Sequence, residues 1–280
     1  QSPEDGGLEK SLESLSLDEL LASVKDDLAR VDAMMDDSDA DVPDAETVLE
    51  DAMKDTNFGL MATTGAAFDV ADKMNKEILF AIYYNKTNDN GHGYWHSTNI
   101  ADPKLRPNPT GVFKSVYPAD DNRYALIGEY QEITPGKLYA INKYMDTYDA
   151  TYTTLVGNDF PFLRYADVVL MYAEALGQQG NISEALTYLN KTRTRADLPE
   201  LTEAEVSGKD AFIKELADER GREFALEGQR WFDLVRLGLA VDLFKSLGYS
   251  LDSHNLLFPI PHDQIEIVND DSILWQNPGF

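Results

Sequence analysis

The chain has 280 residues, of which 43% are hydrophobic and 10% aromatic, enough for one large or two ordinary globular domains with a hydrophobic core. Fifty acidic against 24 basic side chains give a net charge of −26, which repels nucleic-acid phosphates and anionic lipid headgroups. The absence of cysteine excludes disulfides, thiolate metal sites and a cysteine nucleophile in this chain, and no apolar run is long enough to span a membrane.

The N-terminal part predicts a polar segment followed by two helices. Residues 1–15 are polar and contain glycine, so we expect them to be disordered. Ser16 and Glu19 form a capping box at the start of a helix over residues 16–35, whose apolar residues recur at helical spacing. A second helix is predicted from Ala45 to about Lys54, after an acidic linker.

The acidic linker is spaced somewhat like a calcium-binding loop. Its carboxylates are Asp36, Asp37, Asp39 and Asp41. A calcium loop needs glycine at its sharp turn, where this chain has Val42, and a bidentate glutamate where it has Val48. The spacing therefore favours a solvated linker; whether calcium binds is left open, and no cofactor is expected.

The middle of the chain predicts one short extended segment and then a long irregular region. Residues 76–85 are rich in aliphatic and aromatic side chains and predict a short strand or the end of a packed turn. Residues 86–158 are rich in Asn, Gly, Pro and Tyr and show no clear periodicity. Long irregular segments in folded proteins are usually functional, so we expect ligand contacts here.

Helical periodicity returns after residue 158 and predicts a helical pair. The two helices are expected over residues 162–178 and 183–195, with Gly180 in the turn. Ala173 and Ala185 are small enough to let the helices approach closely. This arrangement is typical of tetratricopeptide repeats.

A second helical pair and a tail complete the chain. We expect one helix from Glu203 or Lys209 to Arg236 and another over residues 240–247. Pro259 and Pro261 then prevent helix formation at first. The C-terminal residues 251–280 are predicted to lie as a tail across the surface.

The stretch from Glu219 to Gly238 carries charges on its apolar face. Arg220, Glu223 and Glu227 lie at helical spacing from Trp231, where apolar side chains are expected. A buried charge must be paired, so we predict that these three are buried and paired across helices or with carbonyls of the tail. Opposite charges three residues apart predict the local pairs Glu219–Arg222, Arg220–Glu223, Glu227–Arg230, Arg230–Asp233 and Asp233–Arg236.

Five blocks in this order resemble the SusD/RagB family of outer-membrane nutrient-binding lipoproteins. They are FLRYADVVLMYAEAL, ALTYLNKTRTRADLP, ERGREFALEGQRWFDLVRLG, LLFPIP and QNPGF. The resemblance covers roughly residues 160–280 and is weaker upstream, at SLDELLASVKDDLARV, KEILFAIYYN and DNRY. Compared with typical members, the chain looks shortened in its N-terminal part and lacks the anchor cysteine and signal peptide.

The resemblance implies a mainly α-helical fold of tetratricopeptide-like pairs with a packed irregular region. Residues 16–280 would form a single domain, made of N-terminal elements (16–85), a ligand-facing region (86–158), helical pairs (159–250) and the tail (251–280). It also implies a lipid-anchored protein on the extracellular face of the outer membrane. There it would deliver oligosaccharides, or sometimes peptides, to a TonB-dependent transporter of the SusC type.

The segment GHGYWHSTN, residues 91–99, is the main candidate for glycan contact. Sugar rings bind flat aromatic faces surrounded by polar groups, and Tyr94 and Trp95 are flanked by His92 and His96. The alternatives are that Trp95 packs the loop onto the helices, or that the two histidines bind zinc, which the neighbouring glycines and the lack of a carboxylate motif disfavour. Further candidates for the site are Tyr83, Tyr84, Arg123 and Tyr124.

Catalysis is not expected. Glycan hydrolysis requires two carboxylates flanking one bond, and 50 acidic residues produce many accidental pairs. The sequence contains no nucleophile elbow, phosphate loop or metal triad. The alternative to glycan capture is a tetratricopeptide scaffold that binds a protein segment on its helices.

Overall fold

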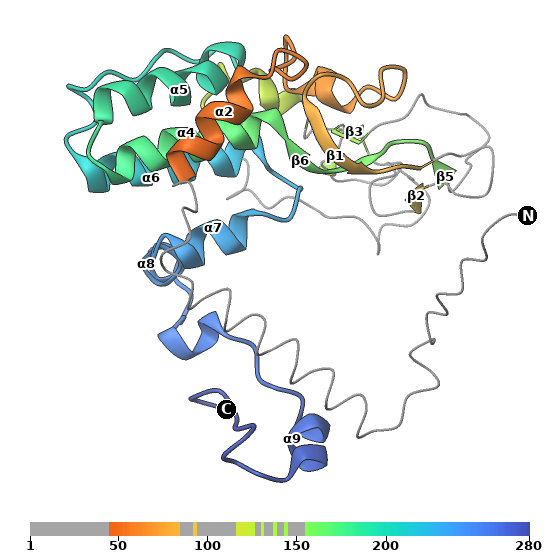
Figure 1. The fold of residues 1–280 in the computed structure, drawn as a ribbon, viewed down its shortest axis with the longest axis vertical. Helices are drawn as coiled ribbons and strands as arrows, with labels where there is room; N and C mark the ends of the chain where they lie inside the picture. Colours follow the sequence, from red (N-terminus) through yellow and green to blue (C-terminus); the bar gives the residue numbers. More distant parts are fainter. Residues whose placement is uncertain are drawn as a thin grey trace, which may run out of the picture. The chain divides into compact units, whose positions relative to one another are not determined.

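The described part of the chain is mainly helical (Figure 1). The computed structural model describes residues 45–84, 116–126, 143–144 and 157–280, and the backbone alone at 92–93, 130–131, 137–138 and 155–156. Residues 45–280 form one compact unit. The segment 1–15 and the helix predicted over 16–35 lie outside the described residues.

Four helices pack together and enclose the main hydrophobic core. They are α2 (Ala45–Lys54), α4 (Tyr165–Gln178), α5 (Ile182–Arg195) and α6 (Lys209–Glu223). Helix α4 contacts each of the other three, as Figure 1 shows. The helical spacing of apolar residues explains this, because it places side chains such as Leu170, Leu189 and Leu216 on one buried face per helix. Helix α2 has the predicted bounds, and α5 begins one residue earlier than predicted.

Small residues allow the helices to approach closely, but the tightest contact differs from the expected one. Gly180 has a φ of +89° and forms the turn between α4 and α5. Ala173 and Ala185 are fully buried. The closest approach is at Gly177 of α4, where a Cβ atom would lie 2.3 Å from the ring of Phe212 on α6. The α4–α6 contact therefore depends on a glycine at this position.

A two-stranded antiparallel ribbon leads into the helices. Strand β1 (Ile78–Ile82) pairs with β6 (Phe160–Arg164), with Ile82 opposite Phe160. The strand predicted within residues 76–85 is confirmed. The predicted helix start at residue 162 is wrong, because pairing with β1 keeps the chain extended to Arg164, where φ is −121° and ψ is 153°.

Two shorter strand pairs lie within the predicted irregular region. Strand β2 (His92–Gly93) pairs with β5 (Leu155–Val156), and β3 (Tyr130–Gln131) pairs with β4 (Lys137–Leu138). Because β5 is followed within four residues by β6, the β2–β5 pair continues the β1–β6 ribbon along the chain.

The long helix predicted to reach Arg236 is interrupted. Helix α6 ends at Glu223 and a separate helix, α7 (Arg230–Arg236), follows. Leu226 has a φ of 68° and Gly228 a φ of 85°, both in the left-handed region that ends a right-handed helix. The single-helix prediction for this stretch is therefore wrong.

Beyond α7 the chain forms short helices and turns. Helix α8 (Ala240–Ser246) is followed by a 3₁₀ turn at Ser253–Leu256 and by α9 (His262–Val268). No residue of the predicted tail, 251–280, is buried. The tail is therefore not packed into the core.

Candidate functional site

Glu223, the last residue of α6, is the centre of a buried ion-pair network. Its carboxylate is 0% exposed and accepts hydrogen bonds from Arg195 Nη2 (2.6 Å), Arg164 Nη1 (3.0 Å), Arg123 Nη1 (3.2 Å) and Thr64 Oγ1 (3.2 Å). These arginines come from α5, from β6 and from the 3₁₀ turn over residues 122–126. The carboxylate thus joins three distant segments to α6.

Two further buried carboxylates share the same arginines. Glu77 accepts from Arg164 Nη1 at 2.6 Å and from Arg195 Nη1 at 2.7 Å. Glu219 accepts from Arg123 Nη1 at 2.6 Å. Because each guanidinium bonds more than one carboxylate, no charge in this cluster is buried without a partner of opposite sign.

Lys143 closes the C-terminal end of α6. Its Nζ donates to the carbonyls of Glu223 (2.9 Å) and Ala225 (3.0 Å) and to the carboxylate of Glu227 (2.6 Å). A helix end leaves carbonyls without partners, and a cation there is favourable. Burial lowers the pKa of Lys143, and Glu227 partly opposes that shift. The carbonyls at the helix break therefore receive their hydrogen bonds from Lys143, a residue of the predicted irregular region.

The pKa of two network carboxylates is shifted downward. Burial alone would raise the pKa of Glu223, but the charges of Arg195, Arg164 and Arg123 outweigh burial and hold the pKa well below its ordinary value. Burial is likewise outweighed at Glu219, where Arg123 lowers the pKa. Both groups are therefore ionised in the folded protein at neutral pH.

These shifts predict an acid-sensitive fold. A carboxyl group with a lowered folded-state pKa stabilises the protein in full above its unfolded-state pKa, about 4.3, and progressively less as the pH falls below it. We expect the free energy of unfolding, measured in urea between pH 7 and pH 3, to fall with pH in the wild type. The difference between wild type and Glu223→Gln should narrow over the same range; a constant difference would contradict the assignment.

Three charged residues of the stretch 219–238 lie in the interior. Arg220, Glu223 and Glu227, which the sequence places on a buried face, are 4%, 0% and 8% exposed. Their partners come from other elements: Arg220 donates to Asp167 of α4 at 2.6 Å and to Asp233 of α7 at 2.8 Å. The stretch therefore fixes how neighbouring elements pack on α6.

Only two of the five predicted local pairs form. Glu219–Arg222 is 3.0 Å long and Asp233–Arg236 is 2.7 Å long. The other three predictions are wrong. Arg220 and Glu223 share α6, and Arg230 and Asp233 share α7, but each pairs with a residue of another element. Glu227, in the break, pairs with Lys143 and Arg164. Arg230, for example, pairs with Asp218 at 3.0 Å rather than with Glu227 or Asp233.

Arg123 does not lie at a ligand rim. Arg123 is 1% exposed and bonds Asp121 through Nη2 at 2.7 Å in addition to the network. Tyr124 is partly buried, and its ring lies 6.2 Å from that of Tyr117. The prediction that Arg123 is a surface contact for ligand is wrong, because its guanidinium forms hydrogen bonds with buried carboxylates.

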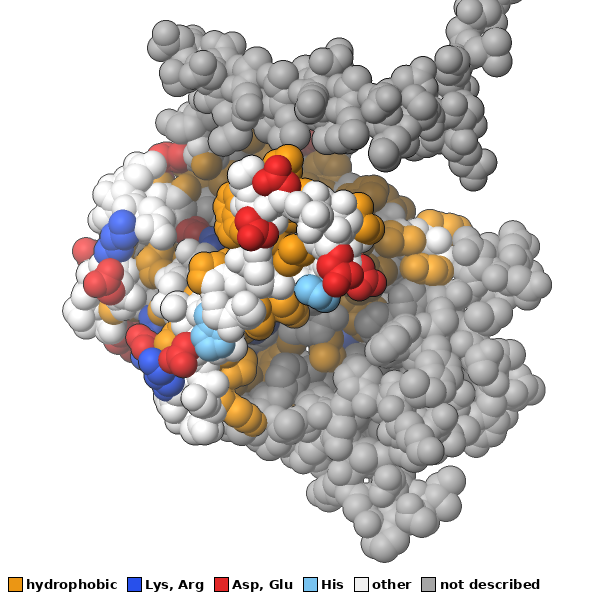
Figure 2. Space-filling view, turned by 90° about the horizontal axis from the view of Figure 1, so that it is seen from below, with side chains coloured by type: hydrophobic (Ala, Val, Ile, Leu, Met, Phe, Trp, Pro, Cys, Tyr) orange, Lys and Arg blue, Asp and Glu red, His pale blue; other side chains and the backbone are white. Residues whose placement is uncertain are grey.

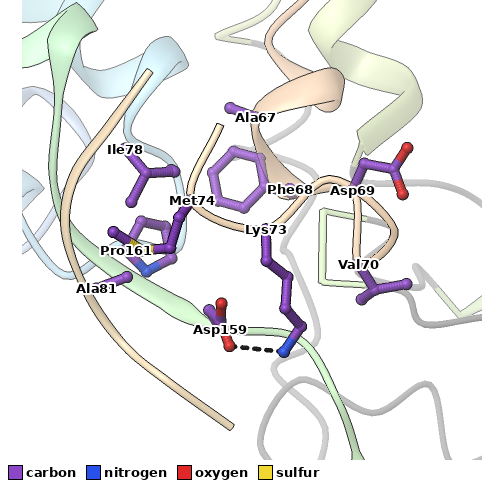
Figure 3. Close-up of a pocket in the computed structure, with 10 residues that line it drawn as sticks. All are labelled: Ala67, Phe68, Asp69, Val70, Lys73, Met74, Ile78, Ala81, Asp159 and Pro161. Atoms are coloured by element: carbon purple, nitrogen blue, oxygen red, sulfur yellow. Dashed lines mark hydrogen bonds and ion pairs between the residues drawn. The ribbon is translucent and has the colours of Figure 1, made fainter. Parts of the chain in front are cut away.

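Tyr83 and Tyr84 directly follow β1, beside a lysine and an aspartate that sequence reasoning missed. Lys73 Nζ pairs with Asp159 Oδ1 at 2.8 Å, as Figure 3 shows, and donates to the Tyr84 carbonyl at 2.6 Å. The Tyr84 amide donates to the same carboxylate oxygen at 2.9 Å. Lys73 Nζ also lies 4.4 Å from the centre of the Tyr83 ring, which is 55% exposed. The ring is thus held by a cation while half of it faces solvent.

A small cavity lies beneath this group. Lys73, Met74, Ile78 and Asp159 are among the residues that line it, and its volume of about 20 Å³ is room for about one water molecule (Figure 3). Asp159 Oδ2 and both amide atoms of Asn158 are buried and form no hydrogen bond within the described residues. All three atoms are closed off from solvent, so none of them is exposed to a ligand in this structure.

The ribbon connects Tyr83 with the predicted glycan-binding segment. Strand β2 contains His92 and pairs with β5, and β5 leads through Asn158 to β6. The side chain of His92, and Tyr94, Trp95 and His96, lie outside the described residues. His92 therefore lies on the β2–β5 pair, which residues 157–159 join to β6.

A larger cleft, of about 320 Å³, also borders strand β6. It is lined by the two residues of β6 on either side of Pro161, which lines the small cavity. Its walls include Phe160, Phe162 and Phe232. Two polar groups at the cleft, Arg220 and Asp233, already bond each other at 2.8 Å. The cleft therefore offers apolar surface but few free partners for hydroxyl groups.

Two properties of the described residues bear on other functions. No group of three His, Cys, Asp or Glu side chains among them could hold a metal ion. None of the helices in this part of the chain is both long enough and apolar enough to cross a membrane.

Comparisons with known proteins agree on one family. The model of the SusD family matches residues 129–256. SusD-like protein P2 of Formosa agariphila is 30% identical over 227 residues, which is 69% of this chain and 42% of the relative. The starch-binding protein SusD of Bacteroides thetaiotaomicron is 32% identical over 139 residues, 46% of this chain and 23% of that protein. The matches thus span less than half of these relatives' length.

Solved structures share the fold. A SusD superfamily protein from Bacteroides vulgatus has a TM-score of 0.66 at 22% identity, covering 84% of this chain and 58% of that one. Surface glycan-binding protein A from Bacteroides thetaiotaomicron has a TM-score of 0.59 at 19% identity, covering 84% of this chain and 59% of that one. The mainly helical fold is therefore shared with these solved structures.

Proposed function

The chain belongs to the SusD family, and we propose that it is a non-catalytic protein that captures oligosaccharides for a TonB-dependent transporter of the SusC type. In this proposal the protein is lipid-anchored on the extracellular face of the outer membrane. The names of two related proteins, one starch-binding and one glycan-binding, support the ligand class.

The proposal rests on the half-exposed Tyr83 ring, which lies against the amino group of Lys73. Sugar rings place their C–H surface on an aromatic face and their hydroxyl groups against carboxylates and amides. Tyr83 supplies the first, and Lys73, which lies 4.4 Å from its ring centre and pairs with Asp159, is the polar group beside it. Trp95 and Tyr94 would extend this surface from the segment that begins with β2, and His92 and His96 would flank them.

Such a site is suited to capture and release. Each sugar hydroxyl exchanges hydrogen bonds with water for similar bonds with protein, so the net gain per contact is small. Modest affinity is an advantage for a protein that must pass its ligand to a transporter.

We expect Tyr83→Ala to weaken glycan binding about 5- to 30-fold, because the loss of one stacking ring costs about 1–2 kcal/mol. The measurement is affinity electrophoresis in gels that contain amylopectin, xylan, galactomannan or laminarin. The polysaccharide that retards the wild type is then used for all variants. Trp95→Ala should reduce retardation as well.

Tyr249→Ala is the matched control, because Tyr249 is 62% exposed but lies far along the chain, after α8. It should migrate as the wild type does. Equal retardation of wild type, Tyr83→Ala and Trp95→Ala would contradict the proposed site. Failure of every polysaccharide to retard the wild type would contradict glycan capture, and release of reducing sugar by pure protein would contradict a non-catalytic role.

A further inference from the structure

The C-terminal segment from Tyr249 to Phe280, called here the tail surface, is ordered without a core of its own. The backbone of Ile260 exchanges two hydrogen bonds with the side chain of Gln276, at 2.8 and 2.9 Å. Asn277 donates to the carbonyl of Phe258 at 2.6 Å. Nevertheless, no residue of the tail surface is buried. Ordering a chain costs conformational entropy that burial normally offsets, so these residues lack the usual compensation.

The tail surface exposes large apolar side chains in unusual number. Each of the following is more than half exposed: Leu257, Phe258, Ile267, Ile273, Trp275 and Phe280. Scattered apolar residues are normal on a protein surface, whereas exposed apolar residues that gather together mark interaction sites. These six fall within 24 residues of the sequence.

The charge of the tail surface is of one sign. From Ser246 to Phe280 the chain contains no lysine or arginine and five acidic residues: Asp252, Asp263, Glu266, Asp270 and Asp271. In Figure 2 hydrophobic side chains lie among carboxylates and the histidines of the tail, whereas Lys and Arg side chains gather toward one side of the view. Any partner surface that covers these apolar groups therefore lies close to carboxylates, and the tail surface itself has no lysine or arginine to pair with them.

We propose that the tail surface docks a protein partner whose apolar patch is rimmed by lysine and arginine. Apolar contact would supply the binding energy, and complementary charge would select the partner and speed its approach. Anionic lipids and a second copy of this chain are repelled by the same carboxylates. The proposal concerns a different surface from Tyr83 and does not depend on glycan capture.

Trp275 provides a direct measurement, because it is 61% exposed and lies within the surface. In a Trp95→Phe/Trp231→Phe background it is the single remaining tryptophan of the three. The probe is a 14-residue helical peptide with leucine on one face and lysine on the other. Two control peptides replace either all lysines by glutamate or all leucines by glutamine. We expect the Leu/Lys peptide to shift Trp275 emission to the blue and to bind at least about tenfold more tightly than either control.

Variants test whether the tail surface itself is responsible. Phe258→Ser/Ile267→Ser should weaken binding of the Leu/Lys peptide at least about tenfold. Asp263→Asn/Glu266→Gln should weaken it and reduce its salt dependence. The matched control is Phe80→Ser/Phe162→Ser, which replaces two side chains 59% and 56% exposed on the ribbon and should leave binding unchanged. Because the tail side chains are exposed, these substitutions leave the core intact.

Three outcomes would overturn the proposal. Equal binding of the Leu/Lys peptide to wild type and to Phe258→Ser/Ile267→Ser would mean that the peptide only follows the net negative charge. A blue shift of Trp275 with phosphatidylcholine vesicles would identify a membrane surface instead. Concentration-dependent dimerisation in sedimentation, abolished by the same double substitution, would identify a second copy of this chain.

Discussion

Replacing Glu223 by glutamine is expected to lower the free energy of unfolding by about 3–5 kcal/mol. The substitution keeps the shape of the side chain but removes the negative charge that faces Arg123, Arg164 and Arg195. It also turns an amide N–H group toward guanidinium donors. Removal of one partner from a buried ionic cluster leaves the opposite charges uncompensated in a medium where water cannot replace it.

Equilibrium unfolding in urea at pH 7 measures the effect of Glu223→Gln. The control is Glu184→Gln, the same chemical change at an exposed position of α5, which should cost less than about 0.5 kcal/mol. A loss of under 1 kcal/mol for Glu223→Gln would show that the network does not hold the folded segments together.

Replacing Arg164 by methionine is expected to cost a similar amount, about 3–5 kcal/mol. The guanidinium bonds Glu77, Glu223 and Glu227, so its loss leaves three buried carboxylates close together. Its carbon also lies 4.9 Å from the ring centre of Phe224, and methionine retains part of that packing. The cost should therefore be mainly electrostatic.

A second substitution distinguishes electrostatics from packing at Arg164. If carboxylate repulsion dominates, adding Glu227→Leu to Arg164→Met should recover part of the lost stability in the urea experiment. The control Arg230→Met removes a partly exposed pair with Asp218 and should cost at most about 1 kcal/mol. If the double variant is less stable than Arg164→Met, and the difference equals the full cost of Glu227→Leu in the wild type, carboxylate repulsion does not dominate.

Local sequence patterns predicted the helices well where packing follows the local period. Helix α2 and the α4–α5 hairpin come from residues whose apolar spacing and turn glycine already specify the structure. The five sequence blocks also identified the family that the comparisons found.

The same patterns failed where distant residues determine the structure. The start of α4 depends on β1, some 80 residues earlier in the chain, and the break after α6 depends on Lys143, which satisfies the carbonyls that the break leaves free. Charges three residues apart predicted local pairs, whereas Glu223 is paired with arginines 28, 59 and 100 residues away. Spacing along one helix carries no information about such partners.

The candidate site was predictable in part. The tyrosine pair after β1 stood out because two aromatic residues end an apolar strand, and Tyr83 is indeed half exposed. Lys73 and Asp159 could not be assigned, since neither belongs to a recognisable motif and 86 residues separate them. Arg123 was misassigned to the surface because nothing local indicates that buried carboxylates surround it.

Glycan capture beside Tyr83 can be followed residue by residue by NMR of protein labelled with ¹⁵N-tyrosine. Spectra are recorded during titration with an oligosaccharide of the polysaccharide that retards the wild type in the gel. We expect shifts of the Tyr83, Tyr84 and Tyr94 amides with one common affinity, and unchanged signals for the core residue Tyr172 and for Tyr249. Shifts confined to Tyr249, or saturable binding that leaves Tyr83 and Tyr84 unmoved, would contradict it.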